Sequence, residues 1–278
     1  MYFAIKIFTG VAGMRMPQLL FSKLIRAAVE FKMFDAGDRI VIGISGGKDS
    51  LFLAYALTVL RDRIKKNISL TALTIDPLFD SNFNVDRIKK FCDELGLEHE
   101  IKRVDIKGAI DSSKRSPCFT CSYFRRAAVN SYALEAGANK VAYAHHLDDA
   151  VETFLMSLLS SGQLTTFLPK TFLDRTGLTV IRPLSYIREH EIEEFMSANG
   201  IETVKSPCPI DGSTNRQSIK ELIRRLEPEY PDLFAHLSSG MRLSSIGELW
   251  AAPQSRSEMR EEYFATIAHK TVERVLKK

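Results

Sequence analysis

Apolar residues near the start of the chain recur with the spacing of a helix. Between residues 17 and 34 they fall every three or four positions, which predicts a helix that begins at Pro17. The apolar face of this helix consists of Leu20, Leu24, Ala27, Phe31 and Phe34. A run rich in β-branched residues follows at 39–44 and predicts a buried strand.

The alternation of strand and helix continues regularly to about residue 159 and weakens after Gly162. Further strands are expected at 70–75, 98–104, 140–144 and 180–184, and further helices at 51–60, 85–95, 119–136, 148–159 and 188–199. Such alternation predicts an α/β fold with a parallel sheet and helices on both faces. Ligands of these sheets bind beyond the carboxyl ends of the strands. The loops at 45–50 and 145–149 lie there, and a charged helical segment ends the pattern near Arg225.

Composition excludes several protein classes. With 45% hydrophobic and 26% charged residues, the 278-residue chain is unlike collagen, disordered chains or disulfide scaffolds. Its net charge of +4 is too small by itself to indicate a nucleic-acid-binding protein. No apolar run is long enough for a membrane helix. Four cysteines without a secretory signal are typical of a reduced protein, so we expect a cytoplasmic location and no membrane contact.

The glycine loop, residues 45–50, has the composition of a phosphate-binding turn. It follows a buried strand, opens a helix and reads Ser-Gly-Gly-Lys-Asp-Ser. Two glycines let backbone N–H groups surround phosphate oxygens, and the helix N-terminus adds positive charge. Lys48 supplies a cation and Asp49 a ligand for Mg²⁺. The spacing differs from the GxxxxGK[ST] loop, and a purely structural glycine turn is the alternative.

Three cysteines form a second candidate site. Cys118 and Cys121 are spaced to grip one metal, and Cys208 lies between two prolines in a later loop. Three thiolates leave a tetrahedral site incomplete. The residues alone therefore leave three readings open: a Cys₃His zinc site completed by His145 or His146, a redox pair, or an iron–sulfur cluster with one iron free of protein.

Basic residues gather on both sides of these cysteines. Residues 111–126 and 216–225 each carry a local charge of +3. Phosphate contacts from these segments would bring RNA to the cysteines, and we expect Arg216, Arg224 and Arg225 to bind it. The alternative is two solvated helical faces.

The glycine loop resembles the SGGxDS loop of the PP-loop ATPase superfamily, which binds the pyrophosphate of ATP and cleaves between the α- and β-phosphates. This resemblance implies an adenine nucleotide alpha-hydrolase-like fold with a five-stranded parallel sheet. It also implies a PP-loop ATPase domain at 37–205, after an N-terminal segment and helix at 1–36. A helical extension at 206–278 would carry the third cysteine.

The stretch from about Leu20 to Met241 resembles the tRNA 2-thiocytidine synthetase family and its 2-thiouridine relatives. The shared features are SGGKDS, CxxC with Arg125-Arg126, HHxDDxxET at 145–153, IRPL at 181–184 and a late proline-cysteine. The resemblance implies a 4Fe-4S cluster on Cys118, Cys121 and Cys208, and activation of a tRNA pyrimidine, expected to be cytidine, as an adenylate. Asp211 stands where the thiocytidine enzymes have a further cysteine.

The same resemblance implies a set of residues around ATP and Mg²⁺. The expected ATP-binding residues are Ser45, Gly46, Gly47, Lys48, Asp49, Ser50, Ile75, Arg125, Ala144 and Asp149. The expected catalytic residues are Lys48, Asp49 and Asp149. The expected partners are tRNA and a sulfur donor, either sulfide or sulfur from a cysteine desulfurase; assembly into a homodimer is left open.

Two other functions remain as alternatives. A lysidine-type PP-loop ligase would also adenylate its substrate, but it would have no use for three cysteines. A nucleotide-binding module with structural zinc would be colourless and would not convert ATP to AMP.

Overall fold

The computed structural model describes residues 8–9, 13–64, 66–80, 83–208, 215–242, 255 and 257. By its internal contacts the chain divides into two compact units, one up to Leu237 and one from Ser238. Asp211 and most of the chain beyond Arg242 lie outside the described residues.

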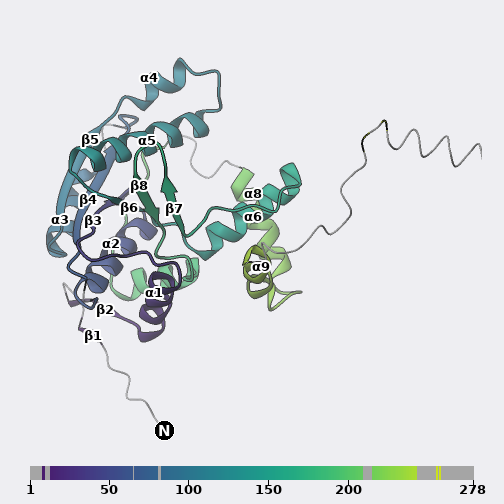
Figure 1. Cartoon of the computed structure of the whole chain (residues 1–278), viewed down its shortest axis with the longest axis horizontal. Helices are drawn as coiled ribbons and strands as arrows, with labels where there is room; N and C mark the ends of the chain where they lie inside the picture. The colour runs from purple at the N-terminus through teal and green to yellow at the C-terminus, as the bar shows by residue number, and fades with distance from the viewer. Residues whose placement is uncertain are drawn as a thin grey trace, which may run out of the picture. The chain divides into compact units, whose positions relative to one another are not determined.

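A six-stranded sheet forms the centre of the first unit (Figure 1). The strand order is β5-β4-β3-β6-β8-β7. These strands are β3 (Arg39–Gly43), β4 (Ser69–Asp76), β5 (Glu98–Arg103), β6 (Lys140–Ala142), β7 (Lys170–Leu173) and β8 (Leu178–Ile181). The first five in this order pair in parallel, which confirms the expected parallel sheet.

The sixth strand, β7, was not expected and pairs antiparallel with β8 at the sheet edge. All four of its residues remain partly or fully exposed, so it has no apolar run that could indicate a strand. Two strands of two residues each, β1 (Phe8–Thr9) and β2 (Arg15–Met16), pair antiparallel in a separate sheet.

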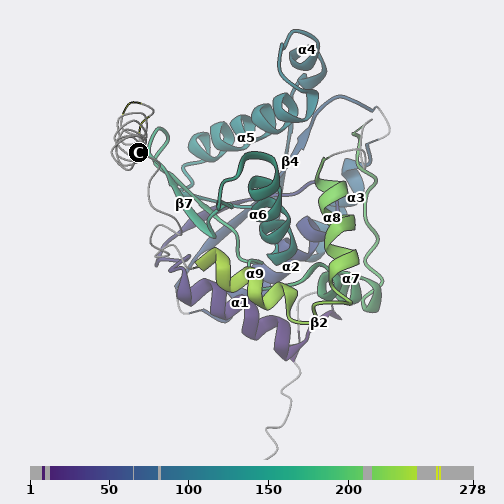
Figure 2. The same ribbon diagram turned by 90° about the vertical axis from the view of Figure 1, so that its right-hand side faces the viewer.

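Helices cover both faces of the sheet (Figures 1 and 2). Successive residues of β3 point to opposite faces, so Ile40 and Ile42 join one hydrophobic core while Val41 joins the other. The first core holds α1 (Gln18–Glu30), α2 (Lys48–Arg61), α3 (Val85–Glu94) and α7 (Glu189–Ala198). The second holds α4 (Ile106–Asp111) and α5 (Pro117–Glu135).

Three further helices complete the described fold: α6 (Leu147–Ser161), α8 (Asn215–Leu226) and α9 (Leu233–Arg242). Helix α6 confirms the expected helix at 148–159, and α8 the charged helical segment that ends near Arg225. Helices α4 and α9 were not expected. Helix α4 has only six residues, too few to produce a recognisable apolar period.

A buried ion pair ties the segment before β3 to β6. The Lys140 ammonium lies 2.6 Å from Asp38 and 2.7 Å from Asp35, and it donates to the Met33 carbonyl at 2.9 Å. The Lys140 side chain is only 4% exposed. This contact aligns two neighbouring strands whose carboxyl ends carry the candidate site.

In the described residues, no helix is both long and apolar enough to cross a bilayer.

Candidate active site

A pocket of about 1410 Å³ opens beyond the carboxyl ends of β3, β4 and β6. It brings together the glycine loop, the loop after β6, the first turns of α5 and the segment before Cys208. Its expected residues are Ser45, Gly47, Asp49, Ser50, Ile75, Cys118, Cys121, Arg125, Ala144, Asp149, Cys208 and Arg216. Two of the expected ATP-binding residues, Gly46 and Lys48, are not part of its lining.

The glycine loop is held in shape by its own serines and by a distant segment. The backbone N–H of Ser45 donates to Ser50 Oγ at 3.1 Å, and Ser50 Oγ donates to the Gly47 carbonyl at 2.9 Å. Gly46 has a φ of +83°, which favours glycine. Its carbonyl accepts a 2.9 Å hydrogen bond from Val204, four residues before Cys208. The loop and one of the cysteines are therefore coupled through the backbone.

The two adjacent aspartates after β6 have different partners. Asp148 is buried and accepts hydrogen bonds from Arg188 Nε at 3.0 Å and from the Glu189 backbone at 2.8 Å, so it anchors the start of α7. Asp149 caps α6 by accepting from the His146 backbone at 3.0 Å. Its other oxygen lies 2.5 Å from Arg216 Nη1. Asp149 is therefore both a helix cap and a member of the pocket.

His146 lies between carboxylates from both loops. Its Nε2 is 3.4 Å from Asp149 and 3.9 Å from Asp49. Burial lowers the pKa of His146, but the surrounding carboxylates outweigh burial and raise it above its usual value. Burial also raises the pKa of Asp49, opposed by His146 and Lys48. Two carboxylates from separate loops, next to a phosphate-binding turn, have the chemistry that Mg²⁺ requires.

Five lining residues bury a polar atom for which the described part of the chain supplies no hydrogen-bond partner. The atoms are Asp49 Oδ1, Arg125 Nε, Tyr143 OH, His145 Nδ1 and Arg182 Nε. Each unpaired buried group costs about 1–3 kcal/mol. Because a nucleotide offers many polar atoms, a pocket with this set fits ATP.

Lys48 points to a carboxylate of α7. Its ammonium lies 2.9 Å from Glu189 Oε1 and 3.4 Å from Asp49. Burial lowers the pKa of Lys48, but Glu189 and Asp49 outweigh it, so the pKa is raised and the cation is retained. Lys220 of α8 binds the other oxygen of Glu189 at 2.5 Å. Glu189 thus links the glycine loop to α8, and sequence reasoning missed it.

The three cysteines line one pocket although Cys208 lies 87 residues beyond Cys121. Cys118 and Cys121 are in the first turns of α5. Burial raises the pKa of Cys121, and the Arg125 guanidinium opposes that effect. Within the described ranges, no group of three His, Cys, Asp or Glu side chains is arranged to hold a single metal ion. In a 4Fe-4S cluster each cysteine binds a different iron, so the thiolates stand further apart than around one zinc.

The three arginines expected to bind tRNA fall into two environments. Arg224 and Arg225 are exposed near the end of α8 and do not line the pocket. Arg216 enters the pocket, where it contacts Asp149 and lies 3.7 Å from Glu152. Arg182 also lines the pocket. Sequence reasoning missed Arg182 as a site residue. Its place in the IRPL motif at 181–184 was the signal that could have identified it.

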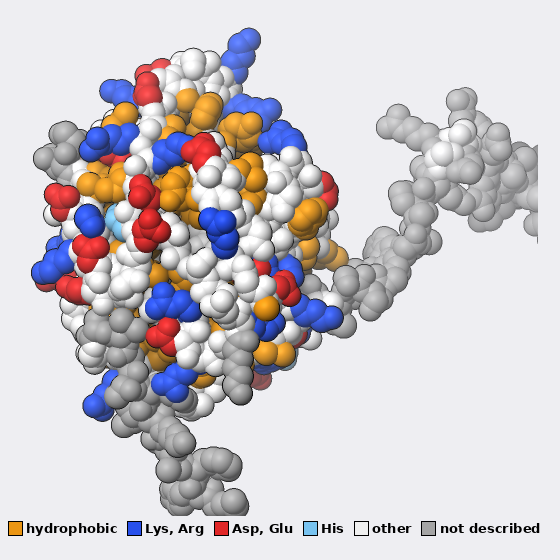
Figure 3. Space-filling view, turned by 60° about the vertical axis from the view of Figure 1, so that its left-hand side comes forward, with side chains coloured by type: hydrophobic (Ala, Val, Ile, Leu, Met, Phe, Trp, Pro, Cys, Tyr) orange, Lys and Arg blue, Asp and Glu red, His pale blue; other side chains and the backbone are white. Residues whose placement is uncertain are grey.

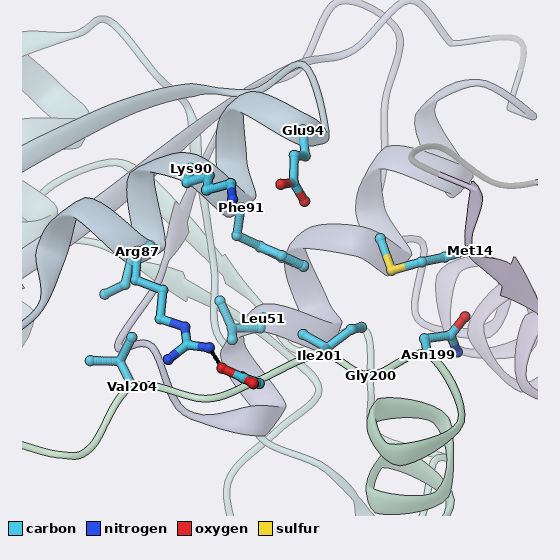
Figure 4. A pocket seen from close by; sticks show the side chains of 12 residues that line it. Met14, Leu51, Arg87, Lys90, Phe91, Glu94, Asn199, Gly200, Ile201 and Val204 are labelled. Carbon is cyan, nitrogen blue, oxygen red and sulfur yellow. Dashed lines mark ion pairs between the residues drawn. The ribbon is translucent and has the colours of Figure 1, made fainter.

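A second cavity, of about 290 Å³, is lined mainly by α3 and by residues 199–204 (Figure 4). Ile88 and Val204, which would contact a Cβ at Gly46, are among its lining residues. An ion pair between Arg87 and Glu202 crosses it. None of the expected site residues lines this cavity. The larger pocket is therefore the candidate active site.

Comparison with known proteins agrees with this geometry. The family model of the PP-loop domain matches residues 20–226. The chain belongs to the PP-loop family. The PP-loop protein is also 36% identical over 217 residues to the tRNA-cytidine(32) 2-sulfurtransferase of Syntrophotalea carbinolica, a match that covers 76% of this chain and 83% of the relative. The enzyme of the same name from Geobacter metallireducens is 36% identical over 211 residues, which cover 74% and 82%. These matches place the chain in the tRNA-cytidine(32) 2-sulfurtransferase family.

A solved structure shares the fold. The U34-tRNA thiolase NcsA from Methanococcus maripaludis, solved with its [4Fe-4S] cluster, superposes on this PP-loop protein with a TM-score of 0.68. The two sequences are 24% identical, and the match covers 85% of this chain and 83% of that one. The expected PP-loop fold class is confirmed.

Proposed function

We propose that this protein is an ATP-dependent tRNA sulfurtransferase that replaces the C2 oxygen of a tRNA cytidine with sulfur. One observation carries the proposal: the glycine loop and all three cysteines of the CxxC and proline-cysteine motifs line the same pocket. A lysidine-type ligase would need the first feature and not the second. Relatives named for cytidine 32 support that nucleotide as the target.

The proposed first step is adenylation of the base. The C2 oxygen attacks the α-phosphorus of ATP, a new O–P bond forms, and the bond to the bridging oxygen breaks so that pyrophosphate leaves. The glycine loop and Lys48 bind the phosphates, and Asp49 and Asp149 would hold Mg²⁺. For this Lys48 must exchange Glu189 for phosphate oxygens. Arg125, with its unpaired Nε, adds positive charge where negative charge grows.

Cys118, Cys121 and Cys208 would hold the 4Fe-4S cluster, which supplies an iron without a cysteine ligand for sulfur. The second step replaces the adenylated oxygen with sulfur and releases AMP. Sulfide is the proposed donor, because it displaces AMP without any change of oxidation state. Sulfur from a cysteine desulfurase would first have to be reduced to sulfide. Homodimer assembly and the cytoplasmic location stay predictions.

Nucleoside analysis of tRNA tests the proposal. Cells lacking the gene should lose 2-thiocytidine and regain it with the wild-type gene but not with Asp49→Asn. Purified anaerobic enzyme should form AMP and pyrophosphate in step with thiolation. Formation of ADP alone would contradict adenylation. Loss of 2-thiouridine instead of 2-thiocytidine would correct the base, and loss of lysidine would establish the ligase.

A further inference from the structure

The first two turns of α5 expose three aromatic rings. Phe119, Tyr123 and Phe124 are 44%, 48% and 37% exposed. In the described part of the chain only two other aromatic side chains, Phe172 and Tyr230, are among the exposed large hydrophobic residues. Burial of apolar area normally drives such rings inside. Three of them together on one short stretch therefore indicate a surface that something else covers.

These rings contribute little to the fold. Helix α5 joins the second hydrophobic core through Ala128, Val129 and Ala133, and none of the three rings belongs to that core. Phe119 and Tyr123 are four positions apart and so share one helical face. The rings of Tyr123 and Phe124 stand edge to face with their centres 5.5 Å apart. These aromatic side chains therefore lie together at the surface and do not join the core.

The charged residues nearest to the rings along the chain are positive. Between residues 112 and 134 the chain has Lys114, Arg115, Arg125 and Arg126 and no aspartate or glutamate. The Arg115 guanidinium lies over the Phe119 ring, 4.7 Å from its centre. Figure 3 shows, in the upper part of one face of the molecule, Lys and Arg side chains beside hydrophobic ones, with some Asp and Glu side chains among them. This combination of aromatic rings and cations complements a nucleic acid, which has flat bases and negative phosphates. An acidic surface patch would repel those phosphates.

The rings lie next to the active site along α5. Cys118 and Cys121 lie on the same two helical turns, and Arg126 lines the pocket, although the rings themselves do not. A nucleotide next to the reacting base would therefore meet the aromatic rings as it approaches the cysteines. RNA loops are recognised by stacking their unpaired bases on aromatic rings and arginine planes.

We propose that Arg115, Phe119, Tyr123 and Phe124, here called the α5 platform, stack an unpaired tRNA base beside the nucleotide to be thiolated. This rests on the proposed function only in taking tRNA as the substrate. The platform holds the neighbouring base out of the helical stack, so that the target base can enter the pocket. Arg115 completes the stack and neutralises an adjacent phosphate.

The test compares tRNA affinity at several salt concentrations for Phe119→Leu/Tyr123→Leu and the wild type. Leucine keeps the apolar volume and removes the ring. We expect the double variant to bind tRNA about tenfold more weakly. The salt slope, which is the slope of log affinity against log salt concentration, should not change, because stacking is not ionic. Arg115→Gln should instead reduce the slope by about one unit. Tyr123→Phe should bind like the wild type, as should Phe172→Leu, the matched exposed ring on β7.

Iron content, ATP affinity and oligomeric state are measured on the same samples. These should not change, because the platform faces the RNA alone. Wild-type tRNA affinity in the double variant would overturn the platform. Conversion of a dimer to a monomer would also overturn it and assign the face to a second copy of the chain. If the wild type binds no tRNA, the proposed function itself fails.

Discussion

At the scale of single residues, Arg216 has different surroundings from the other two arginines expected to bind tRNA, although all three belong to α8. Its guanidinium is inside the pocket on Asp149, whereas Arg224 and Arg225 are exposed outside it. Sequence spacing could group the three but could not tell which side of α8 faces the pocket. Because Asp149 is the proposed Mg²⁺ ligand, Arg216 is placed to pass from this carboxylate to a nucleotide phosphate.

The Arg216→Ala variant should therefore bind ATP much more weakly than the wild type does, while its binding of tRNA changes less. We expect a KM for ATP at least about tenfold higher, the loss typical of one charged hydrogen-bonding group, with tRNA affinity nearly unchanged. The double variant Arg224→Ala/Arg225→Ala should bind tRNA more weakly. The slope of the logarithm of its tRNA affinity against the logarithm of salt concentration should fall by about two units. Equilibrium binding of each ligand measures both effects. A selective tRNA defect in Arg216→Ala would return this residue to the RNA surface.

Glu152 gives the unliganded protein a specific pH dependence. Burial, with Asp149 nearby, raises its pKa to about 6, while Arg216 opposes the shift. The folded state therefore holds this proton more tightly than the unfolded state, whose pKa is near 4.5. The stabilisation is complete below about pH 4.5 and is lost as the pH rises through about 6.

Glu152→Gln should remove this dependence. Above pH 7 the variant should be more stable than the wild type by up to about 2 kcal/mol, the equivalent of such a pKa shift. The difference should vanish below about pH 4.5. Urea unfolding of nucleotide-free protein between pH 4.5 and 8 measures it. Parallel stability curves for the two proteins would contradict the assignment.

At the scale of elements, the ion pair between Lys140 and Asp38 holds two central strands in position. Removing one partner leaves a buried charge unpaired, so Lys140→Met should lower the free energy of unfolding by about 3–5 kcal/mol. The exposed helical pair of Lys89 and Asp93, 3.2 Å apart, supplies the control. Lys89→Met should change stability by less than about 0.5 kcal/mol. Equal effects in denaturant unfolding would show that the burial of Lys140 has no energetic weight.

At the scale of the whole molecule, the cysteine site depends on two segments that only folding brings together. Alanine at Cys118, Cys121 or Cys208 should remove the cluster and thiolation together. Cys92→Ala is the control, since Cys92 is buried in the core and burial raises its pKa to about 12. Iron analysis and the visible spectrum of anaerobic protein should give about four irons per chain, as a 4Fe-4S cluster requires. A fully active, iron-free preparation containing zinc would contradict the cluster.

The sequence by itself determined the order and type of most elements and the motifs at the strand ends. It did so because these features are local: β-branched runs, helical spacing and the Gly46 turn depend on near neighbours. It missed β7 and α4, which are too short or too exposed to carry a periodic signal. Only the tertiary structure decided that Asp148 anchors α7 while Asp149 faces the pocket, that Glu189 holds Lys48, and that Arg216 contacts Asp149 inside the pocket. Those assignments depend on which side of each helix meets a distant partner, and that geometry exists only once the chain is packed.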